Sequence, residues 1–124
     1  MTRTLILVGL GGGAGSILRY LTSLALTRYY PTTFPLGTLT VNFVGCFLIG
    51  LLVGLFERQQ LLNQDLKFLL VTGLCGGYTT FSAFTSESIN LFETNNTILA
   101  FGYIGGSIAS GLLATWFGLT LTRL

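Results

Sequence analysis

The sequence predicts an all-helical integral membrane protein with four transmembrane helices. Hydrophobic residues make up 51% of the 124-residue chain, whereas charged residues make up only 8%. A soluble domain carries about 25% charged residues, so this chain has too few to cover a surface that faces water. Its apolar residues also gather in stretches long enough to cross a bilayer, which takes about 20 residues.

Four stretches reach this length, over residues 4–29, 36–56, 66–92 and 97–121. Pro31 and Pro35 bracket the loop after the first stretch, and polar residues fill the other two loops. The first stretch follows Arg3 as the core of a signal peptide would, but it continues to Leu18 without a cleavage-type site. We therefore interpret it as a first transmembrane helix, and residues 1–124 as a single transmembrane channel domain.

The third stretch contains a polar interruption that predicts a break in its helix. The run Gly76-Gly77-Tyr78-Thr79-Thr80-Phe81-Ser82-Ala83-Phe84 lies within an uncharged segment over residues 68–86. Two adjacent glycines followed by Thr-Thr-Phe-Ser make a poor continuous helix. At membrane depth, unwound backbone is tolerated only where it is buried in protein or lines a cavity. The break therefore predicts the functional site, as broken helices do in transporters.

The distribution of basic residues predicts the orientation. Four spans place both termini and the second loop on one side of the membrane. That side holds Arg3, Arg58, Lys67 and Arg123, whereas the other holds only Arg28. An excess of Lys and Arg is typical of the cytoplasmic side.

Small residues at four-residue spacing predict close helix packing, within one subunit or between two. The pairs are Gly11/Gly15, Gly50/Gly54, Gly102/Gly106 and Ser107/Gly111. Because four helices enclose little interior, we expect an oligomer, most simply a dimer.

Uncharged polar side chains at helical spacing predict a polar track through the membrane. They are Thr38 and Asn42 in the second stretch, Ser82 and Thr85 in the third, and Tyr103, Ser107 and Ser110 in the fourth. Each is also compatible with ordinary hydrogen bonds between helices. For Asn42, we favour a donor that lines the path, because it coincides with the other polar faces.

Two phenylalanines and two charged residues complete the candidate site. Phe81 and Phe84 follow the break, and an aromatic ring offers a positive edge to an anion and a negative face to a cation. Arg19 lies well inside the first span, where it either reaches toward an interface or lines a vestibule that attracts anions. Glu87 lies one turn beyond Phe84 and is open to three roles: a pore-mouth group, a partner of Arg19, or an interfacial carboxylate.

Several function classes are disfavoured by the composition. The chain has no histidine, no nucleophile–base pair and no ladder of acids within the spans, which argues against an enzyme and against a proton-coupled pump. A net charge of +2 is too small to suggest nucleic acid. Cys46 and Cys75 lack metal-site spacing and are interpreted as small buried hydrophobes. Neutral donors along a narrow path suit the dehydration of a small anion.

These motifs resemble the Fluc/CrcB fluoride channels over nearly the whole chain. The resemblance is carried by residues 12–20 and 37–47 and by residues 73–84, which hold the Gly-Gly-Tyr-Thr-Thr-Phe-Ser-Ala-Phe string. It implies passive export of cytosolic fluoride through the cell inner (plasma) membrane, and thereby fluoride resistance. It also implies an antiparallel, dual-topology homodimer with two anion pathways near the subunit interface.

The resemblance implies roles for particular residues. Phe81 and Phe84 match the rings whose edges contact fluoride, and Asn42 matches the pore asparagine. Tyr103 and Ser107 fall where the fourth helix contributes hydroxyls, and Arg19 matches the vestibule arginine. A structural sodium ion at the dimer centre would be held by the backbone carbonyls of Gly76 and Thr79.

Two alternatives to this assignment come from other classes. A small multidrug-resistance-type exchanger shares the size and the four spans, but it needs a carboxylate in the first span, where this chain has Arg19 and no acid. A scaffold subunit without transport activity would not need the polar track or the break. Within the favoured class, the four-to-one charge bias leaves a paired, oppositely oriented homologous subunit as the alternative to a homodimer.

Overall fold

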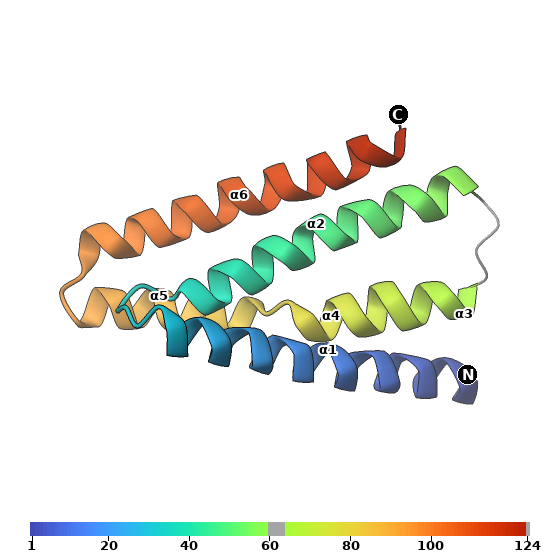
Figure 1. The fold of residues 1–124 in the computed structure, drawn as a ribbon, viewed down its shortest axis with the longest axis horizontal. Coiled ribbons are helices and arrows are strands. Elements are labelled where there is room, and N and C mark those ends of the chain that lie inside the picture. The colour runs from blue at the N-terminus through green and yellow to red at the C-terminus, as the bar shows by residue number, and fades with distance from the viewer. Residues whose placement is uncertain (60–63, 124) are drawn as a thin grey trace.

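The structure is a computed structural model in which residues 1–59 and 64–123 are described. Three long helices, α1 (Thr2–Tyr29), α2 (Leu36–Gln59) and α6 (Thr97–Arg123), run beside an interrupted one (Figure 1). The described residues form no strand. The chain has four helical segments long and apolar enough to span a membrane, over residues 2–29, 36–58, 64–93 and 97–123. The predicted all-helical class and the four spans are therefore confirmed.

The third span consists of four consecutive pieces. These are α3 (Gln64–Lys67), the π-helical η1 (Phe68–Cys75), the short α4 (Gly76–Tyr78) and α5 (Phe81–Glu93). The break falls at Thr79 and Thr80, whose backbones are extended. Thr80 then caps α5, because its hydroxyl accepts a hydrogen bond from the Ala83 N–H at 3.2 Å. The helix thus breaks just after the glycine pair rather than at it.

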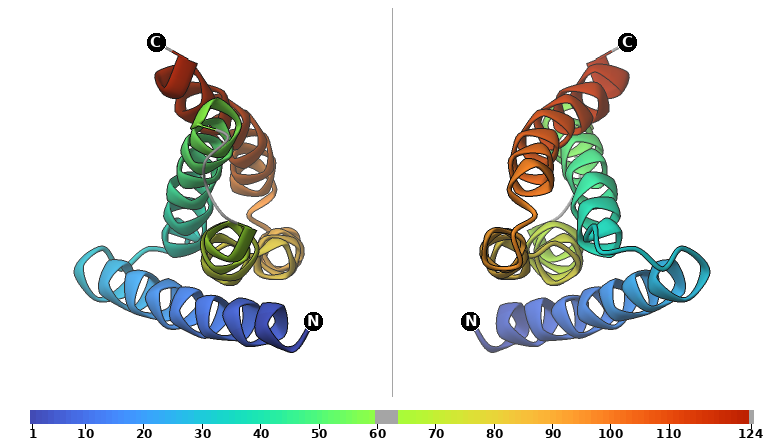
Figure 2. Two further views of the ribbon diagram at one scale, coloured as in Figure 1. Left: turned by 90° about the vertical axis from the view of Figure 1, so that its right-hand side faces the viewer. Right: turned by 90° about the vertical axis from the view of Figure 1, so that its left-hand side faces the viewer.

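The second glycine of the pair serves helix packing instead. A Cβ on Gly77 would lie 2.9 Å from Gly12 Cα, and one on Gly15 would lie 2.8 Å from the Tyr78 nitrogen. By comparison, a Cβ on Gly76 would have open space, since the nearest atom to it would be the Val71 carbonyl oxygen at 3.9 Å. As a result α1 packs directly against η1 and α4, which lie above it in Figure 2.

The second packing unit joins α2 to α6 along most of their lengths. Here Gly50 meets the backbone of Thr115, and Gly118 meets that of Leu51. The Thr115 hydroxyl also donates to the Cys46 carbonyl at 3.1 Å. By contrast, a Cβ on Gly102 or Gly106 would have no described atom within 4 Å, so this predicted pair faces away from the chain's own helices.

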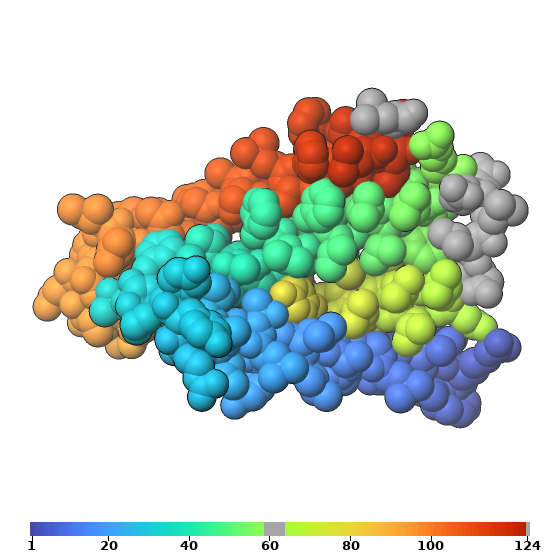
Figure 3. Space-filling view, in the orientation of Figure 1, coloured from blue at the N-terminus to red at the C-terminus, as the bar shows by residue number. Residues whose placement is uncertain are grey.

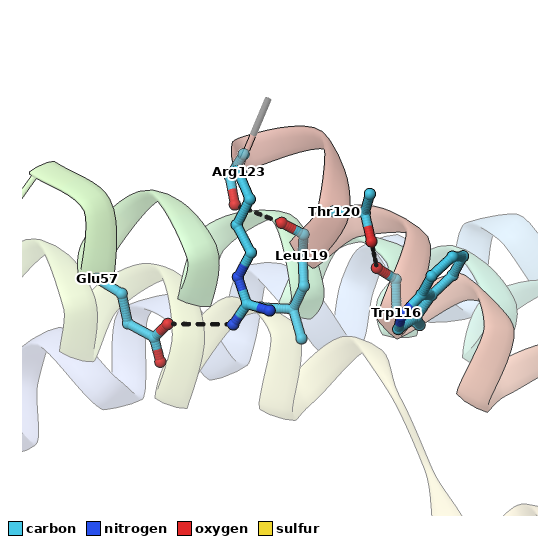
Figure 4. Close-up of polar contacts among 6 residues, drawn as sticks. Glu57, Trp116, Leu119, Thr120 and Arg123 are labelled. Atoms are coloured by element: carbon cyan, nitrogen blue, oxygen red, sulfur yellow. Dashed lines mark hydrogen bonds and ion pairs between the residues drawn. The ribbon is translucent and has the colours of Figure 1, made fainter.

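Both termini lie at the same end of the bundle, opposite the loop over residues 30–35 (Figure 1). Polar contacts close this end. Arg3 forms an ion pair with Asp65 at 2.8 Å, and Arg123 lies 3.8 Å from Glu57 (Figure 4). Arg58 donates to the Thr122 carbonyl at 2.7 Å and so caps the last turn of α6.

The outer surface is apolar, as expected for a chain in lipid. Large hydrophobic side chains are exposed along α1 and α6, which form opposite margins of the molecule in Figure 3. Ile6, Ile17, Leu112 and Trp116 are examples, each more than half exposed. Few side chains are fully buried, chief among them Tyr103, Val41 and Cys75. Together with the four spans, this surface defines a multi-pass membrane protein.

Candidate functional site

The helix break is held by the side chain of Asn42 from α2. Asn42 Oδ1 accepts the Thr80 N–H at 2.9 Å, and Asn42 Nδ2 donates to the Thr80 carbonyl at 3.1 Å. In a continuous α-helix the Thr80 N–H would bond to the Gly76 carbonyl instead. The amide thus replaces a lost helical bond. A primary amide has two N–H groups, so one remains for another acceptor.

A cavity of about 300 Å³ lies beside this break. Its walls include Asn42 from α2, Phe81 and Phe84 from α5, and Ser107 from α6. The Ser107 hydroxyl oxygen is buried, and it has no hydrogen-bond partner among the described residues. The cavity therefore joins an amide, a free hydroxyl and two aromatic rings from three separate elements.

Aromatic rings lead from this cavity toward the end of the bundle that carries the 30–35 loop. The centroids of Phe81 and Phe84 are 5.7 Å apart, and those of Phe84 and Tyr103 are 5.3 Å apart. Tyr103 in turn meets Phe34 edge to face, with centroids 5.5 Å apart and an interplanar angle of 88°. Phe34 lines a second cavity of about 310 Å³ at this end.

Glu87 lies between the two regions and accepts two hydrogen bonds. The Thr38 hydroxyl donates to Oε1 at 2.6 Å, and the Tyr103 hydroxyl donates to Oε2 at 3.5 Å. Thr38 and Tyr103 are both buried, and Thr38 and Glu87 line the second cavity. Glu87 therefore lies in the wall of the second cavity, with its carboxylate hydrogen-bonded to α2 and α6.

Three of the predicted hydroxyls bond locally and do not line the first cavity. Ser82 Oγ lies 3.3 Å from Thr80 Oγ1, and Thr85 donates to the Ser82 carbonyl at 3.0 Å. Both residues are exposed on α5. Ser110 donates to the Ser107 carbonyl at 3.4 Å. Within one chain, the cavity thus contains Asn42 and Ser107 but not these three.

On the α1 side of the break, Arg19 contacts the backbone of α4. Arg19 Nε donates to the Gly77 carbonyl at 3.2 Å. Among the described residues no carboxylate forms an ion pair with Arg19, Glu87 included. Thr80, which pairs with Asn42 and caps α5, was not among the predicted site residues. A Thr just before a helical segment is a usual N-cap signal, and it was available in the sequence.

A mostly apolar cavity that holds an amide and a free hydroxyl beside a broken helix, within four membrane-spanning segments, is typical of a membrane transport protein. Residues 6–119 match the family described as CrcB-like protein, Camphor Resistance (CrcB), and the chain belongs to this family. It is 51% identical over 121 residues to the fluoride-specific ion channel FluC of Flavobacterium psychrophilum, covering 98% of each chain. It is 47% identical over 116 residues to FluC of Pseudomonas putida strain F1, covering 94% of each.

Proposed function

We propose that this protein is a fluoride-selective ion channel through which cytosolic fluoride leaves the cell passively. Membership of the CrcB family and the names of its relatives support this function. The observation that carries it is the cavity at the break, where Asn42, Ser107, Phe81 and Phe84 meet.

The cavity offers groups that replace the water around a small anion. The unpaired Ser107 hydroxyl and the second N–H of Asn42 are neutral donors, and each substitutes for one water hydrogen bond. The rings of Phe81 and Phe84 would present positive edges. Phe81 and Phe84 both lie in the cavity wall, so an ion that enters the cavity meets their rings.

A passive pathway is sufficient for fluoride export. Hydrogen fluoride crosses membranes as a neutral acid, ionises at cytosolic pH and is trapped as the anion. A membrane potential that is negative inside then drives the anion outward without coupling to protons. Located in the cell inner membrane, such a channel lowers intracellular fluoride and confers resistance.

The proposed assembly is an antiparallel homodimer of dual topology. In a single chain, the Phe81 side chain is largely exposed, and the Gly102/Gly106 face does not pack against the chain's own helices. A second copy of the chain would pack against both. The charge bias between the two ends makes a paired homologous subunit the alternative partner.

A structural sodium ion fits the backbone of the break. The Thr80 N–H bonds to Asn42, so it does not occupy the Gly76 carbonyl, and Thr79 is extended, so its carbonyl leaves the helical ladder. The described residues contain no cluster of acidic, Cys or His side chains for a metal. The carbonyls of Gly76 and Thr79, doubled by a two-fold axis, would hold the ion and tie the two subunits together.

The direct test is ion efflux from liposomes that hold the purified protein, followed with fluoride and chloride electrodes and without a proton gradient. We expect rapid loss of fluoride while chloride is retained. Equal loss of both ions would refute selectivity. Retention of fluoride until a proton gradient is imposed would indicate a coupled exchanger.

A further inference from the structure

The Arg19 side chain forms a hydrogen bond with the backbone beside the helix break. Its Nε donates to the Gly77 carbonyl at 3.2 Å, and the side chain is partly buried between α1 and α4. The neighbouring turn adds a second link, since the Thr22 and Tyr78 hydroxyls lie 3.1 Å apart. Thr22 already donates to the Leu18 carbonyl at 2.8 Å, so Tyr78 is the donor in this link.

The Gly77 carbonyl is a group that needs such a partner. The last carbonyls of a helix have no N–H within the helix and carry partial negative charge. Helix α4 ends at Tyr78, so Gly77 belongs to this set. The Arg19 Nε–H satisfies this carbonyl, as any correctly placed N–H donor would.

The break is thus held from two sides. Helix α2 holds Thr80 through Asn42, and helix α1 holds Gly77 through Arg19. Tyr78 and Thr79 lie between the two anchored residues, and Thr80 directly precedes Phe81. Close packing of Gly77 on Gly12 leaves little room for the backbone to move.

We infer that Arg19 is a positioning residue that fixes the backbone of the break through the Gly77 carbonyl, rather than a charge that attracts the anion. The inference rests on the proposed channel function, because its effect on flux comes through the placement of Phe81. It concerns the hydrogen bond that Arg19 donates, and not its charge.

Three substitutions separate the hydrogen bond from the charge. In Arg19→Gln, the amide nitrogen stands at the same distance along the side chain as Arg Nε, so the donor remains while the charge is lost. Arg19→Met keeps a similar length with neither donor nor charge. Arg19→Lys keeps the charge, but places a methylene where Nε was and the ammonium one atom further out.

The donor and the charge that each substituted side chain retains determine the expected order of fluoride efflux rates. Arg19→Gln should retain most of the wild-type rate and its dependence on ionic strength, while Arg19→Met falls about tenfold or more below Arg19→Gln. Arg19→Lys should also fall below Arg19→Gln. The inference is overturned if Arg19→Lys retains the flux while the Gln and Met variants lose it equally, or if all three variants behave alike.

Hydrogen exchange gives a readout that needs no flux. In folded protein, amides of residues 79–84 should exchange faster in Arg19→Met than in the wild type, and at the wild-type rate in Arg19→Gln. Unchanged exchange in Arg19→Met would overturn the inference. A wild-type protein that carries no fluoride would refute the channel function, but the exchange result would still decide the role of Arg19.

Discussion

Asn42 combines two tasks in one side chain. Both of its polar atoms pair with the backbone of Thr80, and the same amide lines the cavity with Phe81 and Ser107. The sequence predicted a polar role for Asn42 but not its partner, because residues 38 positions apart meet only through the tertiary fold. Ser82 and Thr85 follow Phe81 and Phe84 by one residue, which rotates them about 100° around α5 and away from the cavity.

Asn42→Asp should lower fluoride flux by about tenfold or more. Aspartate still accepts the Thr80 N–H, but it cannot donate to the Thr80 carbonyl when ionised, and it places a negative charge in the anion's cavity. Liposome efflux measures the change. Asn95→Asp is the matched control, because Asn95 lies in the exposed turn before α6. Wild-type flux in Asn42→Asp would contradict a place for Asn42 on the path.

Phe81→Ile should reduce fluoride flux on the order of tenfold without preventing assembly, because it removes an aromatic edge while keeping an apolar side chain. Phe101→Ile, at a similarly exposed ring on α6, should leave the flux unchanged. Size-exclusion chromatography of both variants would report assembly. Equal flux from the Phe81 and Phe101 variants would remove Phe81 from the proposed pathway.

At the scale of the helices, composition and the length of the apolar stretches were enough to predict four spans and an interrupted third one. The break falls at Thr79 and Thr80, inside the predicted run over residues 76–84, whereas Gly76 and Gly77 themselves are helical and Gly77 makes the close contact with α1. The π-helix η1 over Phe68–Cys75 was not predicted. Its backbone hydrogen-bond register has no characteristic side-chain pattern in these residues.

The two adjacent glycines should respond differently to alanine. Gly77→Ala would bring a Cβ to 2.9 Å from Gly12 Cα, so we expect a loss of about 1–3 kcal/mol in stability and a lower temperature of aggregation in detergent. Gly76→Ala has open space and serves as the control. Comparable unfolding midpoints for both variants would show that α1 and α4 do not pack this closely.

At the scale of the whole molecule, one chain supplies the cavity, the aromatic series and the hydrogen-bonded Thr38–Glu87–Tyr103 cluster. The exposed Phe81 ring and the open Gly102/Gly106 face are left for a partner. The spacing of the glycines indicated close helix packing, but it did not indicate which pairs pack against other helices of the same subunit. That distinction depends on helix orientation, which pairs Gly50 with Thr115 and leaves Gly102 outside.

Passive and selective conduction of fluoride by this protein can be measured as a reversal potential in a planar bilayer. With a tenfold fluoride gradient and equal chloride on both sides, we expect a reversal potential of about 59 mV in magnitude, the equilibrium value for a monovalent ion. This value should not move when the pH of one side is changed. A potential near zero would show that the protein is not selective for fluoride, and one that follows the proton gradient would show coupling to protons.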